Sequence, residues 1–353
     1  MKTAKTKKSR KTSKFKNFIK DHSIGIIVAS CLVIALIVGV MVFALPSYKG
    51  SEKWVRVPQG ATEESVGDSL RSSLGDSFGN RVFLLWKLQG GDPRVAHGIY
   101  RVEEGMTAGR VSHNIKSGRQ TPVKVSFNGV RTMDRLAERV TKNLEMTPEQ
   151  FLDAVKTYLY QRDFSEAQFP AAFLPDSYEF YWTVSPGALV EMLVGERDRF
   201  WTPERIQKAK AEGLTPNDIA VVASIVEEES AKRDEWPTIA RLYLNRLHRG
   251  MPLQADPTVK FATVDPTLRR ITGQHLKIDS PYNTYIYKGL PPGPIRIVER
   301  MSLEAVLDAP KNDYLYMCAK EDFSGYHNFT SNYSEHLANA RRYQDVLNRK
   351  GIK

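Results

Sequence analysis

The pattern of apolar and polar positions divides the chain into stretches of different character. The longest apolar stretch covers residues 23–45, SIGIIVASCLVIALIVGVMVFAL, and contains no charged side chain. As a helix it extends roughly 35 Å at ~1.5 Å per residue, enough to cross the hydrocarbon core of a bilayer. We therefore predict a single transmembrane helix over residues 23–45.

Two other interpretations of this stretch stay open. A cleavable signal peptide has a shorter apolar segment of about 7–15 residues, although VFA at residues 42–44 fits a cleavage site. VASC at residues 28–31 resembles a lipoprotein processing site, but the apolar stretch continues for fourteen residues after Cys31. The length of the stretch favours the membrane-spanning helix over both.

A short pattern repeats between the apolar stretch and residue 145. Alternating apolar residues, typical of a strand, precede a glycine, then a threonine two or three positions later, then helical spacing. Glycine permits a tight turn, and threonine caps the helix that follows. The repeats begin at Val55, Tyr100 and Val125, with glycines Gly60, Gly105 and Gly129 and threonines Thr62, Thr107 and Thr132. They predict small α+β modules.

The second repeat, YRVEEGMTAGRVSHNI from Tyr100, resembles a LysM module. That resemblance implies a small fold that binds the N-acetylglucosamine-containing backbone of the bacterial wall. The alternative is a packing or spacer module without a ligand, and the pattern alone does not separate the two.

Helical spacing dominates from residue 146, with one interruption. FPAAFLPDSYEFYWTVSPGA, residues 169–188, combines prolines with six aromatic side chains. We predict an irregular loop here. Its aromatic side chains either line a groove or fill the core beneath the loop.

LTPNDIAVVASIVEEESAK, residues 214–232, predicts a buried helix. Thr215 is a suitable N-cap and Pro216 suits the first helical position. Apolar residues occupy nearly every side, which is typical of a helix inside a core. They are Ile219, Val221, Val222, Ala223, Ile225 and Val226.

Three consecutive glutamates, Glu227, Glu228 and Glu229, end this helix. The negative end of the helix dipole, the neighbouring like charges and burial all raise the pKa of a carboxyl group there. A raised pKa is what a general acid requires. A helical projection favours Glu227 or Glu229 over Glu228 and does not decide between those two. The alternative is that all three glutamates lie in solvent.

The net charge of +11 does not indicate nucleic-acid binding. Residues 1–22 carry nine Lys/Arg and one Asp, and the remainder carries 42 basic and 39 acidic residues. The charge is therefore mostly a tail beside the apolar stretch. By the positive-inside rule the tail is cytoplasmic and the body of the protein lies on the outer face of the plasma membrane.

Polar and aromatic motifs follow the central helix. MPLQADPTV contains Gln254 and Asp256, and SPYNTYIYKGLPPGPI contains Tyr282, Asn283 and Tyr285. Aromatic faces with amide and hydroxyl groups are typical of sugar sites. Together with ASIVEEES, LNRL and GYHNFTSNYSEH, these strings cover most of residues 170–345 and resemble the MltG/YceG family of endolytic murein transglycosylases.

The resemblance implies cleavage of the MurNAc–GlcNAc β-1,4 bond of peptidoglycan, with 1,6-anhydro-MurNAc ends and no metal or cofactor. It assigns the catalytic acid/base to Glu227. His327 is a candidate groove residue, although a lone histidine is more often structural. It assigns substrate binding to Gln254, Asp256, Tyr282, Asn283 and Tyr285. It also implies a role in limiting glycan strand length, beside cell wall synthases. Ala255, Phe261 and RIVER after Ile295 depart from the family pattern at the edge of the groove.

The expected fold class is α+β. We expect a basic tail (1–22), a transmembrane helix (23–45), a LysM-like module (46–145) and a larger mixed α/β catalytic domain (146–353). The sequence contains no HExxH, GxSxG or GxxxxGK[ST] motif and no cysteine-rich metal spacing. Two other functions remain. One is a lysozyme-like hydrolase with a second carboxylate from Asp234, Asp256 or Asp265, and the other is a non-catalytic wall-binding scaffold.

Overall fold

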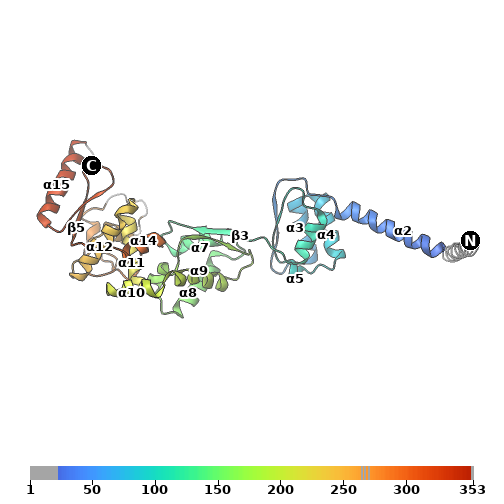
Figure 1. Ribbon diagram of the computed structural model, residues 1–353, viewed down its shortest axis with the longest axis horizontal. Coiled ribbons are helices and arrows are strands. Elements are labelled where there is room, and N and C mark those ends of the chain that lie inside the picture. Colours follow the sequence, from blue (N-terminus) through green and yellow to red (C-terminus); the bar gives the residue numbers. More distant parts are fainter. Residues whose placement is uncertain (1–22, 264, 266–267, 269–270, 351–353) are drawn as a thin grey trace, which may run out of the picture. The chain divides into compact units, whose positions relative to one another are not determined.

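The computed structural model describes residues 23–350 except 264, 266–267 and 269–270. Within them, helices surround two-stranded antiparallel sheets, a mixed helix and sheet architecture (Figure 1). The chain divides into two compact units, one up to residue 122 with residues 181–183, and one over 123–180 and 184–353. This division differs from the boundary expected near residue 145. The reason is that the third repeat begins with a strand that pairs inside the second unit.

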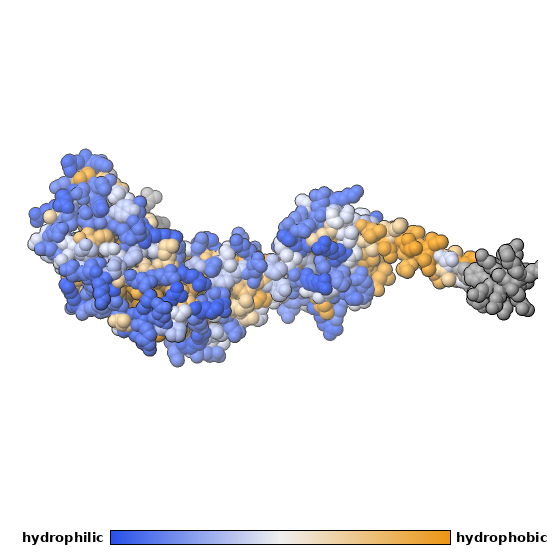
Figure 2. Space-filling view, viewed as in Figure 1, coloured by the Kyte–Doolittle hydropathy of each residue, from blue (hydrophilic) through white to orange (hydrophobic). Residues whose placement is uncertain are grey.

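An uncharged and mostly apolar helical segment begins the described part of the chain. Helix α2 (Ser23–Gly39) continues into a π-helical turn, η1 (Val40–Ala44), so the helix covers nearly all of the predicted stretch. Its large apolar side chains are exposed and form the orange surface in Figure 2. Among the described residues it is the one helix long and apolar enough to cross a membrane, over Ile27–Ala44. Such a surface suggests a membrane anchor or a signal sequence.

The first unit packs helices against a two-stranded sheet. Strands β1 (Lys53–Val57) and β2 (Gly98–Val102) are antiparallel, with Val55 opposite Tyr100. Between the strands lie α3 (Glu63–Leu74), α4 (Asp76–Leu88) and α5 (Pro93–Ala96), and α6 (Ala108–Lys116) follows β2. Trp86, Tyr100 and Ile115 are among the side chains that fill the core of this unit.

The predicted strand–turn–helix repeats are confirmed at all three positions. Gly60, Gly105 and Gly129 have φ angles of 74°, 84° and 59°. Residues with a Cβ atom rarely adopt this region of backbone conformation. The hydroxyls of Thr62, Thr107 and Thr132 accept hydrogen bonds from backbone N–H groups of the helices that follow. Each helix therefore begins where the sequence pattern places it.

In the second unit, strand β3 (Val123–Phe127) pairs with strand β4 (Asp176–Phe180). Around them lie α7 (Met133–Thr141), α8 (Pro148–Tyr160), the 3₁₀ helix η2 (Glu166–Ala172) and α9 (Pro186–Phe200). The prediction of an irregular loop over 169–188 is therefore wrong. Residues 176–180 form a strand because they pair with β3, and a local sequence pattern does not reveal that partner. Phe169, Phe173 and Phe180 are buried, so these aromatic side chains fill a core.

Helix α11 (Pro216–Glu229) runs through the main core of the second unit (Figure 1). The elements that follow the second sheet are α10 (Pro203–Ala211), η3 (Arg233–Glu235), α12 (Trp236–His248), α13 (Asp256–Ala262), η4 (His275–Lys277), α14 (Arg300–Leu307), β5 (Tyr316–Ala319), β6 (His327–Thr330) and α15 (Tyr333–Arg349). Strands β5 and β6 pair antiparallel.

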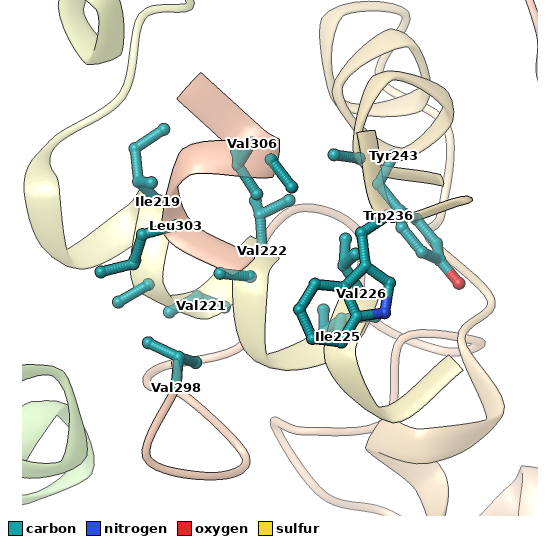
Figure 3. Close-up of a cluster of buried hydrophobic side chains, with 14 of the residues drawn as sticks. Ile219, Val221, Val222, Ile225, Val226, Trp236, Tyr243, Val298, Leu303 and Val306 are labelled. Atoms are coloured by element: carbon teal, nitrogen blue, oxygen red, sulfur yellow. The ribbon is translucent and has the colours of Figure 1, made fainter. Parts of the chain in front are cut away.

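The prediction that α11 is buried on all sides is confirmed. Every residue from Ile219 to Val226 is at most 3% exposed. Figure 3 shows the apolar side chains of α11 among Trp236 and Tyr243 of α12 and Leu303 and Val306 of α14. The polar exception is Ser224, whose hydroxyl donates to the Val221 carbonyl and accepts from the Ile295 N–H. The bond from Ile295 fixes residues 293–295, Gly-Pro-Ile, against the helix.

Gly293 in that segment lies against the backbone of η2. A Cβ atom at residue 293 would lie 1.7 Å from the Ala167 carbonyl oxygen. We expect Gly293→Ala to lower the free energy of unfolding by about 2–3 kcal/mol, because backbone cannot move as a flexible side chain can. Chemical denaturation of the full chain measures this. Gly273→Ala, with no atom within 4 Å, is the matched control, and equal losses in the two variants would contradict the close approach.

Candidate active site

A polar pocket of about 320 Å³ lies at the C-terminal end of α11. Helices α11, α12, α13 and α15 and strands β5 and β6 contribute to it, with the segments just before α13 and around residue 285. Its lining consists of Glu229, Leu242, Tyr243, Arg246, Leu253, Gln254, Asp256, Tyr285, Met317, Cys318, Ala319, His327 and His336. Three predicted substrate residues, Gln254, Asp256 and Tyr285, thus meet at one glutamate of the central helix.

Glu229 is the glutamate that lines the pocket. The Tyr243 hydroxyl donates a hydrogen bond to Glu229 Oε1 at 2.5 Å. Burial raises the pKa of Glu229 to about 7, and the charge of Asp256 acts in the same direction. The Tyr243 hydrogen bond and the charge of Arg246 act in the opposite direction. A substantial protonated fraction near neutral pH suits this carboxyl group to proton donation.

Glu227 has different surroundings. Its Oε2 accepts hydrogen bonds from the Glu299 N–H at 3.0 Å and the Ser302 hydroxyl at 2.9 Å. Its Oε1 lies 2.9 Å from an Arg296 nitrogen, and only 4% of the side chain is exposed. Burial raises the pKa of Glu227, opposed by the Glu299 N–H and by Arg296. Both oxygens are therefore held by protein groups that join the end of α11 to the start of α14.

Glu228 is also bound by protein groups. Arg131 contacts one of its oxygens at 2.5 Å and Arg296 contacts the other at 2.9 Å. Only 13% of its side chain is exposed. The interpretation that all three glutamates lie in solvent is therefore wrong. The guanidinium groups balance the carboxylates that the helix dipole disfavours.

The motifs around Gln254 and Tyr285 are joined by hydrogen bonds. Gln254 has a φ of 50°, in the left-handed region, and its N–H donates to the Thr284 carbonyl at 3.0 Å. The Tyr285 hydroxyl donates to Asp256 Oδ1 at 2.7 Å. A strained, well-bonded turn of this kind holds polar side chains at fixed positions in the pocket wall.

Tyr282 and Asn283 lie outside the lining of this pocket. Asn283 is fully buried, and its side-chain amide donates to the carbonyls of Leu276 and Ile278. The Tyr282 ring packs on Phe261 with ring centroids 4.7 Å apart. Both residues shape the loop that carries Tyr285. The sequence gave no sign that the Asn283 side-chain amide would bind backbone carbonyls and not a ligand.

No group of three or more His, Cys, Asp or Glu side chains within the described residues is arranged to hold a metal ion.

Comparison with known proteins identifies the family. The model of the YceG-like family matches residues 55–342, most of the chain and all of the pocket lining. The chain belongs to the YceG-like family.

The relatives of this YceG-like chain include two bacterial proteins named endolytic murein transglycosylase. The protein from Bacillus subtilis strain 168 is 39% identical over 141 residues, 40% of this chain. The protein from Streptococcus pneumoniae strain D39 is 25% identical over 312 residues, 78% of this chain. The matched region spans 38% and 56% of the lengths of these two relatives.

A crystal structure of a YceG-like protein from Listeria monocytogenes has the same fold. The TM-score is 0.54 at 23% sequence identity, over 82% of this chain and 98% of the other. At this level of sequence identity, the similarity shows a shared fold and nothing about function.

Tyr243 and Arg246 line the YceG-like pocket but were not predicted as site residues, although the quoted string LNRL contains Arg246. They lie one turn apart on α12, and Arg246 is buried with its guanidinium donating to the carbonyls of Leu253 and Leu315. The detectable signal was a pair of polar residues at i and i+3 on an otherwise apolar helix face. His327 does lie in the pocket, as a candidate groove residue should.

We expect Glu227→Ala to destabilise the fold, by about 3 kcal/mol, because it leaves the buried Arg296 guanidinium without one of its carboxylates. Thermal or urea unfolding measures the loss. Glu138→Ala is the control, since Glu138 forms an exposed pair with Arg135 and its removal should cost less than about 0.5 kcal/mol. A Glu227 variant as stable as the Glu138 variant would contradict the structural role.

Proposed function

We propose that this YceG-like chain is an endolytic lytic transglycosylase that cleaves the MurNAc–GlcNAc β-1,4 bond of peptidoglycan strands. The names of its relatives support the reaction class and the substrate. The polar pocket at the end of α11 supports a saccharide ligand, since it combines amide, hydroxyl, carboxyl and guanidinium groups.

Within this proposal, the pocket geometry favours Glu229 as the catalytic acid/base, whereas the family resemblance implies Glu227, and the variants described below decide between the two. The observation that carries the choice is the pocket itself, which contains Glu229 together with Gln254, Asp256 and Tyr285. The raised pKa of Glu229, about 7, fits an acid that must hold its proton near neutrality. Both carboxylate oxygens of Glu227, by contrast, are bound by protein groups, namely Arg296, the Glu299 N–H and the Ser302 hydroxyl.

The proposed reaction needs one carboxyl group in two roles. Protonated Glu229 donates its proton to the glycosidic oxygen as the bond from that oxygen to C1 of MurNAc breaks. The 6-hydroxyl of the same sugar then attacks C1, and the carboxylate takes up the hydroxyl proton. The product is a 1,6-anhydro ring, and Glu229 is protonated again. The attacking hydroxyl belongs to the same sugar as C1. The reaction therefore avoids the loss of translational entropy that binding a separate nucleophile would require.

A hydrolase is the second candidate, and one observation favours it. Asp256 lines the same pocket as Glu229 and raises its pKa through its charge. Two carboxyl groups in one site are typical of glycosidases that use water or a covalent intermediate. Asp234 lies outside the pocket lining and accepts a hydrogen bond from Tyr326. A non-catalytic scaffold is the remaining alternative.

The apolar helix provides the cellular context of the proposal. We infer that it anchors the chain in the plasma membrane, with the basic tail in the cytoplasm and both units on the outer face. There the enzyme would act on glycan strands close to cell wall synthases and limit strand length. In this context the strand–turn–helix repeats of the first unit act as a LysM-like glycan-binding or spacer module.

We expect Glu229→Gln to reduce cleavage of purified glycan strands by at least about 100-fold, because the amide cannot donate the required proton. Chromatography and mass spectrometry of the ends separate the candidates. Anhydro-MurNAc ends that vanish in Glu229→Gln support the transglycosylase, and reducing MurNAc ends support the hydrolase. Folded Glu227→Gln protein should keep its activity per folded molecule. Loss of cleavage in folded Glu227→Gln, with Glu229→Gln active, would reverse the assignment.

The pKa of Glu229 predicts the direction of the pH dependence. Since the protonated form is the active acid, kcat/KM should fall about tenfold per pH unit above about pH 7. The same raised pKa means that folding is favoured by the protonated form. This stabilisation is full below the ordinary carboxyl pKa and declines as the pH rises to about 7. Circular dichroism at each pH therefore checks that lost activity is not unfolding. A rate that rises through pH 7 would contradict Glu229 as the acid.

A further inference from the structure

A second buried carboxylate lies directly behind the pocket wall. Glu235, at the end of η3, is 7% exposed. Its Oε1 accepts a hydrogen bond from the backbone N–H of His327 at 2.8 Å. Its Oε2 lies 2.9 Å from Nδ1 of the same histidine. A single carboxylate thus holds both the backbone and the ring of one residue in the pocket lining.

The Glu235 carboxylate is itself held in place from the end of α11. The Ser230 hydroxyl donates to Glu235 Oε2 at 3.2 Å and accepts from the Lys232 N–H at 3.0 Å. Ser230 directly follows Glu229 in the chain. The position of the histidine ring is therefore tied to the same turn that presents the proposed catalytic acid.

The chemistry of the pair determines which ring nitrogen is free. An ionised carboxylate only accepts hydrogen bonds, so Nδ1 of His327 carries the proton that points to Glu235. In the neutral ring, Nε2 then has a free lone pair. The side chain lines the pocket, and among the described residues the structure gives Nε2 no hydrogen-bond donor. A histidine oriented by a carboxylate is a recurring arrangement in sites where the second nitrogen binds a ligand.

We propose that His327 binds the sugar in the Glu229 pocket, with Nε2 accepting a hydrogen bond from a saccharide hydroxyl, and that Glu235 is the residue that positions it. The inference rests on the proposed function, because it takes a glycan as the occupant of the pocket. It adds a substrate contact on β6 to the pocket that the 254–256 and 285 segments also line.

Another histidine–carboxylate pair in the same unit provides a matched control. Nε2 of His248 lies 3.6 Å from a Glu212 oxygen, and this histidine is half exposed. Glu212 is engaged by Arg241, and neither His248 nor Glu212 lines the pocket. A substitution there tests what loss of a surface histidine does to the protein.

The test compares His327→Asn with His248→Asn in the full chain, using purified glycan strands as substrate. Asparagine at 327 keeps an N–H at the Nδ1 position that can reach Glu235, and it lacks the Cε1 and Nε2 atoms of the ring. We expect His327→Asn to lower kcat/KM about tenfold, the loss typical of one hydrogen bond to substrate. Its melting temperature should stay near that of the wild type. Glu235→Gln should lower kcat/KM in the same direction, and His248→Asn should leave it unchanged.

A binding measurement keeps the test decisive if a variant at 327 fails to fold. Glu229→Gln protein labelled with ¹⁵N-histidine is titrated with a glycan oligosaccharide that it cannot cleave. The Nε2 resonance of His327 should shift on saturation while that of His248 does not.

Two outcomes overturn the inference: a folded His327→Asn enzyme with kcat/KM within twofold of the wild type, or an unchanged Nε2 resonance at saturating glycan. Failure of the proposed function looks different, since the wild-type protein would then cut no strands. In that case the ¹⁵N titration alone decides whether His327 contacts sugar.

Discussion

The pocket depends on the burial of α11. Its apolar residues are enclosed by α12 and α14, which removes the freedom of the helix to rotate or slide (Figure 3). At its C-terminal end, Arg296 binds both Glu227 and Glu228, so the last turn is fixed as firmly as the middle. Fixing the last turn sets the direction of Glu229 and places Ser230 against Glu235. Without this rigid helix end, neither the Glu229 carboxyl group nor the His327 ring would have a defined position.

The three glutamates illustrate how surroundings give identical side chains different roles. Glu227 and Glu228 lie beside guanidinium groups and act as anchors, which compensates for the unfavourable end of the helix dipole. Glu229 has a tyrosine hydroxyl as its hydrogen-bond partner, and burial dominates its pKa. Glu227 and Glu229 differ in their position around the helix axis, since residues two positions apart in an α-helix are separated by roughly 200° of rotation.

The predictions from sequence were most accurate where the physics is local. The capped strand–turn–helix repeats follow from glycine backbone freedom and threonine side-chain chemistry, and the structure contains all three. The buried central helix follows from its all-round apolar pattern. The prediction of a loop over residues 169–188 failed because β4 exists through its pairing with β3, some fifty residues earlier in the chain. The resemblance assigned catalysis to Glu227, which lies outside the pocket lining, and that assignment stays a prediction. It grouped Tyr282 and Asn283 with Tyr285, and of these three Tyr285 alone lines the pocket.

What the sequence by itself determined was the set of elements, the apolar segment, the family resemblance and the short list of polar groups that include the site. What only the tertiary structure decided was which of these groups face one another. Arg296, Ser302 and the Glu299 N–H bind Glu227 from about seventy residues away in the chain. Glu229 shares its pocket with residues of the 254–256 and 285 segments. Desolvation and charge pairing act through space, so the spacing of VVASIVEEES leaves open which glutamate keeps its proton. The packing of the elements around α11 places Glu229 in the polar pocket and raises its pKa to about 7.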